Sequence, residues 1–236
     1  MFITQTDSTN DFLRQMLVES DLSEFFVVQT DFQNAGRGQR GNIWQSECGK
    51  NLLFSVLLKP KHINATEQFI VSQMAALAVK NTLAEFADGF TVKWANDIYW
   101  RDKKIGGILI ENDLNGSEIK HSIIGIGLNI NQIHFSDTLP NPVSLSNITG
   151  KVFDKEKILE RIFENFKNLY FSTNFDEIRT LYFNNLYRKN GFFPYQSGDE
   201  KFLAKITAIK NDGKIVLTKT SGDEKEFYFK ELKFVK

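Results

Sequence analysis

Residues 103–131, KKIGGILIENDLNGSEIKHSIIGIGLNIN, contain the pattern that decides the fold. Two apolar runs, Ile105 to Ile110 and Ile119 to Ile130, have the length and composition of buried strands. Between them lies Asn115-Gly116, a pair that favours a tight hairpin turn. The sequence therefore predicts a hairpin of two long strands in the middle of the chain.

Strands and helices continue on both sides of this hairpin without regular alternation. Further strands are predicted at Phe25 to Gln29, Leu52 to Leu58 and Phe90 to Trp94. Helices are predicted after the capping residues Ser8-Thr9-Asn10, from about Thr66 to Asp88 with a stop at Gly89, from Asp154 to Tyr170, and from Asn174 to about Arg188. The irregular order indicates an α+β domain with a mixed sheet and flanking helices, and it argues against a dinucleotide-binding fold.

The end of the chain has a different pattern. From Gly191 onward the apolar residues show no helical spacing, and Asn211-Asp212-Gly213 forms a hairpin signal between short strands. We therefore expect two domains, residues 1–189 and residues 190–236. The second would be a small β-barrel packed on the first, because fewer than 50 residues bury little core alone.

Composition narrows the class of function. The 236 residues include 29 Lys and Arg and 29 Asp and Glu, so the formal charge is zero and binding to DNA or to an acidic membrane is not expected as the main task. Cys48 is the single cysteine, so an internal disulfide is excluded. No signal peptide is recognisable, and no apolar run approaches the roughly 20 residues that span a bilayer. We expect a cytoplasmic protein.

The stretch from Gln33 to Trp44, QNAGRGQRGNIW, is the first candidate for chemistry. Its three glycines let the backbone approach a ligand, and their N–H groups can bind an anion. Arg37 and Arg40 supply permanent charge for a carboxylate or phosphate. The spacing alone fits a surface loop or an RNA-binding Arg-Gly segment equally well, and the Gly-Lys-Ser/Thr ending of a Walker loop is missing.

Three further motifs follow in order along the chain. Lys93 to Asp97, KWAND, combines a lysine suited to phosphate with amide and carboxylate oxygens suited to hydrated Mg²⁺, or it is an ordinary turn. Lys104 leads into a strand with the paired glycines Gly106-Gly107, which often mark a close approach by a ligand or a backbone, or the strand simply begins with a solvated lysine. Gly125 to Asn131, GIGLNIN, ends a strand with two asparagines, or simply runs into a turn.

Together and in this order, the motifs resemble the biotin–protein ligase (holocarboxylase synthetase) family. That family shows Ser-Thr-Asn, a Gly-Arg-Gly-Arg-x-Gly-Arg loop ending in Trp, Lys-Trp-Pro-Asn-Asp, Lys-x-x-Gly-Ile-Leu with a nearby Glu, and Gly-x-Gly-x-Asn. The resemblance covers nearly the whole chain, in the short form without a DNA-binding helix-turn-helix. This sequence departs from the pattern at three positions: Gln39 and Asn42 replace arginines of the loop, and Ala95 replaces proline.

The resemblance implies a catalytic domain like that of class II aminoacyl-tRNA synthetases and an SH3-like C-terminal barrel. It also implies a two-step activity. The biotin carboxylate attacks the α-phosphorus of ATP to give biotinyl-5'-AMP, and a lysine of a biotin carboxyl carrier protein or carrier domain of a biotin-dependent carboxylase then displaces AMP. ATP, Mg²⁺ and biotin are implied, without a tightly bound prosthetic group, and a homodimer is compatible with the family.

Site roles carry over residue by residue. The positions that match the family's biotin contacts are Ser8, Thr9, Asn10, Gln33, Gly36, Arg37, Gly38, Gln39, Lys104 and Gly107. The positions that match its ATP and adenylate contacts are Arg37, Arg40, Trp44, Lys93, Asn96, Lys104 and Asn129. Arg37, Lys93 and Lys104 are expected to be catalytic, and Asp97 is expected to bind the metal.

Two rival functions remain open. A lipoate–protein ligase or octanoyltransferase would share the fold by resemblance, although those families lack the combination of this loop with the Lys-Trp-x-Asn-Asp turn. A non-catalytic binder of biotin or RNA would use the Arg-Gly loop without chemistry, and the zero net charge argues against RNA.

Overall fold

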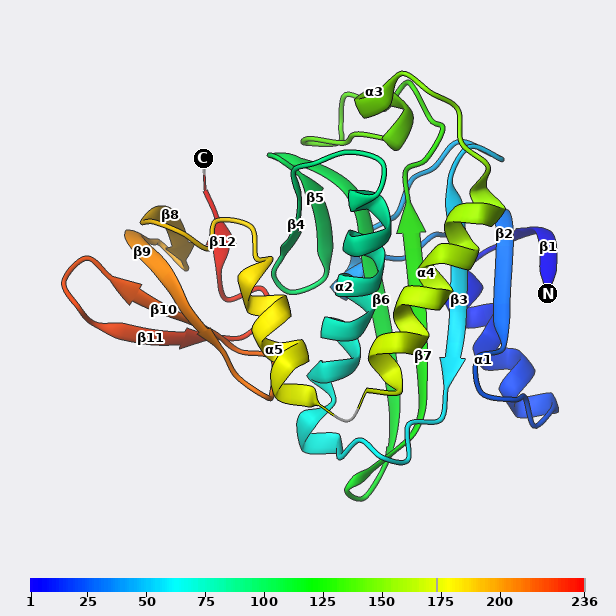
Figure 1. Ribbon diagram of the computed structural model, residues 1–236, viewed down its shortest axis with the longest axis horizontal. Helices are drawn as coiled ribbons and strands as arrows, with labels where there is room; N and C mark the ends of the chain where they lie inside the picture. The colour runs from blue at the N-terminus through cyan, green and yellow to red at the C-terminus, as the bar shows by residue number, and fades with distance from the viewer. Residues whose placement is uncertain (173, 236) are drawn as a thin grey trace.

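Seven strands form the main sheet, in the order β1-β2-β3-β7-β6-β5-β4 (Figure 1). The computed structural model describes residues 1–172 and 174–235, apart from the side chain of Arg40. The strands are β1 (Phe2–Thr6), β2 (Val27–Gln33), β3 (Leu52–Leu58), β4 (Phe90–Lys93), β5 (Asp97–Trp100), β6 (Lys103–Asn115) and β7 (Glu118–Leu128). β1 and β2 are parallel, and the other neighbours are antiparallel. The mixed sheet predicted from the sequence is confirmed.

Helices cover both faces of this sheet. They are α1 (Thr9–Glu19), α2 (Phe69–Ala84), α3 (Leu145–Thr149), α4 (Lys155–Tyr170) and α5 (Phe175–Asn184). α2 and α4 lie side by side over one face (Figure 1), where they enclose the larger hydrophobic core. α1 packs on the opposite face through Leu13, which contacts a smaller cluster with Val28 and Leu57. β3 lies between both layers, so all seven of its residues are buried.

The central hairpin is confirmed, with Gly107 of β6 opposite Gly127 of β7. Other boundaries differ from the predicted ones. β2 starts two residues after Phe25, because Phe25 has a φ of 64° and belongs to the preceding turn. The long helix ends at Ala84, and Gly89, at a φ of 96°, makes the later turn into β4. β1, β5 and α3 were not predicted.

The C-terminal residues form a five-stranded antiparallel sheet, as expected for a small β domain. Its strands are β8 (Phe193–Ser197), β9 (Glu200–Ile209), β10 (Ile215–Lys219), β11 (Glu224–Phe227) and β12 (Lys233–Phe234), in the order β11-β10-β9-β8-β12. Buried side chains of this sheet, such as Tyr195 and Leu217, belong to the same hydrophobic cluster as α2 and α4. The division at residues 189 and 190 stays a prediction.

Trp94 joins the two sheets. Its Nε1 donates a hydrogen bond to the carbonyl of Gly213 at 2.8 Å, and its ring meets Phe229 edge-on at 5.9 Å. Gly213 has a φ of 87°, and a Cβ there would lie 2.7 Å from the ring of Phe69, so glycine is required. Within the described residues, no helix combines the length and the apolar character that crossing a bilayer would need.

Candidate functional site

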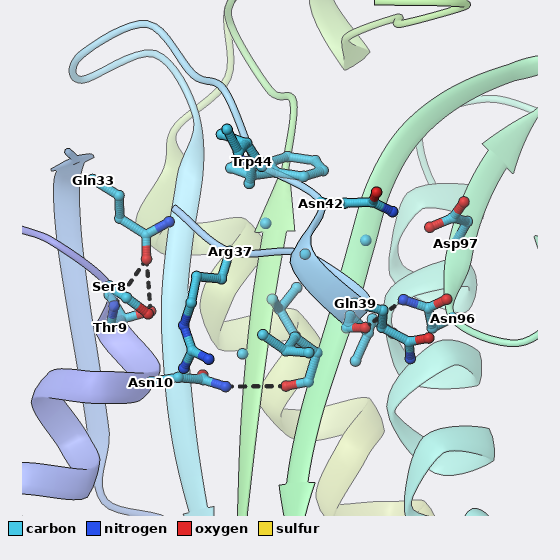
Figure 2. A pocket seen from close by; sticks show the side chains of 18 of the residues that line it. Ser8, Thr9, Asn10, Gln33, Arg37, Gln39, Asn42, Trp44, Asn96 and Asp97 are labelled. Carbon is cyan, nitrogen blue, oxygen red and sulfur yellow. Dashed lines mark hydrogen bonds between the residues drawn. The ribbon is translucent and has the colours of Figure 1, made fainter. Parts of the chain in front are cut away.

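A cleft opens where the N-terminus of α1, the ends of β2 and β7, and β5 and β6 meet under the loop of residues 36–44 (Figure 2). It holds about 700 Å³ of empty space, its open mouth included. Twelve of the predicted site residues line it: Ser8, Thr9, Asn10, Gln33, Arg37, Gly38, Gln39, Trp44, Asn96, Asp97, Lys104 and Gly107. Segments far apart in sequence therefore meet in one place.

A buried polar network forms one wall of the cleft. Ser8 caps α1, as predicted, by accepting a long hydrogen bond (3.5 Å) from the N–H of Asp11. Thr9 donates to Oε1 of Gln33 from its backbone N–H at 2.9 Å and from its hydroxyl at 3.1 Å. Oγ of Ser55, on β3, lies 2.6 Å from Oδ1 of Asn10 and 2.7 Å from Oγ1 of Thr9. These groups offer a neutral ligand both donors and acceptors.

Glycines of β6 and β7 create the space for this wall and for Trp44. A Cβ on Gly125 would collide with the amide of Asn10, and one on Gly127 would lie 2.6 Å from the indole of Trp44. A Cβ on Gly107, which lies opposite Gly127, would come within 3.4 Å of the same indole. Gly107, which the sequence associated with close approach, therefore accommodates the chain's own Trp44 as well as bordering the cleft, and Gly125 and Gly127 make room for side chains in the same way.

The loop of residues 36–44 is closed by its own backbone. The N–H of Gly38 donates to the carbonyl of Asn42 at 2.7 Å, and that of Trp44 donates to the carbonyl of Gly36 at 2.8 Å. A short 3-10 turn, Gln39–Gly41, forms its tip. Gly36 is buried beneath Trp44 rather than open to the cleft. The expectation for the side chain of Arg40 lies outside the described part of the chain.

Arg37 points from the loop toward Asn10 (Figure 2). Its guanidinium pairs with two carboxylates: Asp11, and Glu111 through Nη1 at 3.2 Å and Nη2 at 3.1 Å. Part of its charge is therefore already balanced by protein groups. The catalytic role predicted for Arg37 stays a prediction, and Glu111 was not predicted as a site residue.

Lys104 and Asp97 face each other from neighbouring strands on the other side of the cleft. Nζ of Lys104 lies 2.6 Å from Oδ1 of Asp97 and 5.8 Å from the centre of the Trp44 ring. Asn96 is tied to β6, because its Nδ2 donates to the carbonyl of Ile108 at 2.7 Å. A cation, a carboxylate and an aromatic surface thus converge where a negatively charged ligand could bind.

Besides Gly36, the predicted residues Lys93 and Asn129 do not line the cleft. Nζ of Lys93 donates to the hydroxyl of Tyr99 at 2.9 Å and lies over the rings of Tyr99 and Phe234. Asn129 is buried, and its Nδ2 donates to the carbonyl of Val143 at 3.1 Å. Asn129 therefore supports the strand end behind the cleft, and the ligand contacts predicted for both residues remain predictions.

Several residues that line the cleft were not predicted as site residues. They are Asn42, Ile43, Ile108, Leu109, Gly125, Ile126, Gly127 and Phe229. The motifs around Trp44, Lys104 and Gly125 contain all but one of them. Phe229 comes from the C-terminal β region, and no local pattern marked it.

Comparison with known proteins agrees with this arrangement. The model of the biotin/lipoate A/B protein ligase family matches residues 2–129. The chain belongs to this family. The resemblance seen in the sequence motifs is thereby confirmed, for a region that contains nearly every lining residue of the cleft.

Several relatives of this ligase-family chain carry biotin-ligase names. Bifunctional ligase/repressor BirA of Bacillus subtilis is 30% identical over 217 residues, covering 89% of this chain and 66% of that protein. Biotin--[acetyl-CoA-carboxylase] ligase of Paracoccus denitrificans is 30% identical over 165 residues, covering 67% of each. The chain spans 41% of the length of BirA from Escherichia coli.

Solved structures of the family share the whole fold. Biotin protein ligase from Aquifex aeolicus in complex with biotin and ATP superposes with a TM-score of 0.81 and 26% identity, covering 100% of this chain and 98% of that one. Biotin protein ligase from Leishmania major in complex with biotinyl-5-AMP has a TM-score of 0.68 at 21% identity, which supports the fold. Both sheets of this family member therefore have counterparts in known structures.

Proposed function

We propose that the chain is a biotin–protein ligase, which uses ATP to convert biotin to biotinyl-5'-AMP and then transfers biotin to a lysine of a carrier domain. The observation that carries this proposal is the convergence, in one cleft, of the uncharged polar side chains of Ser8, Thr9 and Asn10 and a charged wall around Lys104 and Asp97. Biotin has a neutral ureido ring and a carboxylate, so its two ends match the two walls.

The polar wall suits the ureido ring. Hydrogen-bond donors and acceptors of Ser8, Thr9 and Asn10 lie at the N-terminus of α1 with little exposure to solvent. Buried polar groups that pair with a ligand discriminate strongly against molecules that lack those partners. This wall would therefore select the ureido ring.

The charged wall suits the reacting groups. A biotin carboxylate and the triphosphate of ATP repel each other, so the first step needs positive charge where the negative charge accumulates. Lys104 lies at the head of β6 beside Gly107, and its ammonium can donate to both a carboxyl oxygen and the α-phosphate. Asp97 holds that ammonium in place until the substrates bind, because it lies 2.6 Å away.

Mg²⁺ fits this wall through a single carboxylate. Among the described residues that line the cleft, Asp97 is the one acidic side chain, and proteins usually hold Mg²⁺ with one or two carboxylates, water and substrate phosphates. Within residues 1–172 and 174–235, no three or more His, Cys, Asp and Glu side chains are placed so that they could hold a metal ion together. When bound, Mg²⁺ would offset the charge of the triphosphate, with Asp97 as its protein ligand.

The mixed anhydride must be kept from water until the acceptor arrives. The loop of residues 36–44 covers the cleft, and Trp44 lies against the glycines of β6 and β7. The loop would exclude water from the adenylate. An acceptor lysine then attacks the carbonyl, and AMP leaves. A biotin carboxyl carrier domain is the acceptor class proposed.

The family model also includes lipoate ligases, so the decisive experiment compares acids. Exchange of labelled pyrophosphate into ATP is measured with biotin, lipoate or octanoate as the added acid. We expect exchange with biotin alone. Exchange with lipoate instead would identify the rival ligase, and binding of biotin without exchange would identify a non-catalytic binder.

A further inference from the structure

Glu111, on β6 next to the cleft, joins three separate parts of the molecule. Its Oε2 accepts hydrogen bonds from Nδ2 of Asn10 at 2.9 Å and from Nη2 of Arg37 at 3.1 Å, while Oε1 accepts from Nη1 of Arg37 at 3.2 Å. The side chain is 24% exposed. Burial alone would raise the pKa of Glu111, but the bonds from Asn10 and Arg37 and the charges of Arg37 and Arg14 outweigh it and lower the pKa. The carboxylate is thus charged at neutral pH.

Arg37 attaches the first part of the loop of residues 36–44 to β6. Among the described side chains of residues 36–44, Arg37 alone hydrogen-bonds to the rest of the protein. The loop is otherwise closed on itself by backbone bonds, and Trp44 holds its other end by packing on Gly107 and Gly127. A two-pronged guanidinium–carboxylate contact therefore fixes the loop to the sheet.

Asn10 is fixed by the same carboxylate. A carboxylate only accepts hydrogen bonds, so the Asn10 amide must turn its NH₂ group toward Glu111. Its Oδ1 then faces Ser55, at 2.6 Å. Asn10 is 2% exposed, so water does not compete for these partners. Glu111 thus sets the direction of an amide in the polar wall and the position of the loop above it.

We infer that Glu111 is a positioning residue that couples the polar wall to the loop, so that the adenylate is retained while the Arg37–Glu111 pair is intact. Glu111 does not line the cleft and acts through Arg37 and Asn10. The inference rests on the proposed ligase function for its substrate. The coupling itself is a property of the protein alone.

The first test measures how readily a protease cleaves the loop of residues 36–44, and it does not depend on ligase activity. Trypsin cleavage after Arg40 is timed by mass spectrometry in wild type, Glu111→Gln and the control Asp113→Asn. Glutamine would place a donor against the donors of Arg37 and Asn10, whereas Asp113 contacts Arg14, at 3.3 Å, and neither of those two residues. Cleavage should be roughly tenfold faster in Glu111→Gln, the factor expected for one charge-assisted contact. Equal rates in all three proteins would overturn the coupling.

A second pair of variants keeps this test decisive. If Glu111→Gln does not fold, Arg37→Gln removes the same pair from its half-exposed partner. Cleavage after residue 40 should then be at least as fast as expected for Glu111→Gln, because the contact of Arg37 with Asp11 is lost too. Glu111→Asp keeps the charge at a shorter reach and should restore protection in part. If trypsin cleaves Arg37→Gln no faster than wild type, the inference is overturned.

The last test concerns the adenylate. In Glu111→Gln, the KM for biotin should rise more than kcat falls, and adenylate formed in a single turnover should dissociate roughly tenfold faster. The effects of Glu111→Gln and Arg37→Gln on this dissociation should be less than additive, because the two residues form one pair, even though Arg37 also contacts Asp11. Independent, additive effects would contradict the coupling. Absence of biotin-dependent exchange in wild type, with the trypsin difference present, would instead refute the proposed function and leave the coupling standing.

Discussion

Lys104 and Asp97 form an ion pair across β5 and β6, with Nζ 2.6 Å from Oδ1. In the sheet Asp97 lies opposite Gly107, and Lys104 lies opposite Tyr99, so the two side chains meet diagonally across a shift in the register. Both side chains line the cleft. The two side chains lie next to each other and carry opposite charges, so we expect them to bind different partners. Lys104 would bind the anionic substrates, and Asp97 would bind the cation that accompanies them.

Replacing Lys104 by alanine should slow biotin-dependent pyrophosphate exchange by roughly 10²–10³, because one charge-assisted contact to the developing adenylate is lost. Lys103→Ala is the matched control, because Lys103 is the adjacent residue and its side chain is exposed and does not line the cleft. Exchange in Lys104→Ala at the rate of the control would rule out the assigned role.

Asp97→Asn should raise the Mg²⁺ concentration needed for half-maximal exchange while leaving biotin binding nearly unchanged. The amide keeps the shape of the side chain and removes the charge that attracts the cation. Initial rates are measured across a Mg²⁺ titration, and biotin affinity is measured by calorimetry. An unchanged Mg²⁺ requirement would mean that Asp97 serves only to hold Lys104.

Gln39→Arg should slow the escape of the adenylate. Gln39 lies at the tip of the loop and lines the cleft, where the family pattern has an arginine that could pair with phosphate through two charged bonds. Adenylate is formed in a single turnover and chased with unlabelled ligand. Gln45→Arg adds the same charge outside the cleft lining and should leave the rate unaltered. Equal rates for wild type and Gln39→Arg would show that position 39 does not govern retention.

Gly125→Ala should raise the KM for biotin by roughly ten- to hundredfold, because the new methyl group would displace the amide of Asn10 and leave buried partners unpaired. Combining it with Asn10→Ala should relieve the collision and recover thermal stability without recovering biotin affinity. Both quantities are measured on both variants. Normal biotin affinity in Gly125→Ala would show that the Asn10 amide is not a contact.

The lowered pKa of Glu111 predicts a pH dependence of stability. A carboxylate whose pKa is depressed in the folded protein stabilises it above the unfolded pKa of about 4.3, and this contribution is lost as pH falls through the folded pKa. The difference in unfolding free energy between wild type and Glu111→Gln, measured in urea, should therefore be largest near neutral pH and shrink on acidification. A constant difference would show that Glu111 acts without its charge.

Short motifs allowed much of the site to be predicted, because each motif places its residues on one strand end or loop. Lys104 and Gly107 are three positions apart, and Ser8 to Asn10 are consecutive. The cross-chain contacts could not be predicted in this way. Asn10 meets Ser55 across 45 positions and Glu111 across 101, so these pairs depend on sheet order and register.

The strands, too, could be predicted only where their sequence pattern is local. The hairpin and the fully apolar β3 were evident, since their patterns are strong and local. β1 was missed because its side chains are mostly exposed and it is held by pairing with β2. Phe229 reaches the cleft only because the C-terminal sheet packs against Trp94.

The pairing of Gly107 with Gly127 limits how the central hairpin can change in length. A deletion of one residue within either strand would reverse the faces of every following side chain and remove the flat surface beneath Trp44. Changes at Asn115-Gly116, at the far end of the hairpin (Figure 1), leave that pairing intact. A peptide tag inserted between Asn115 and Gly116 should therefore leave the cleft undisturbed.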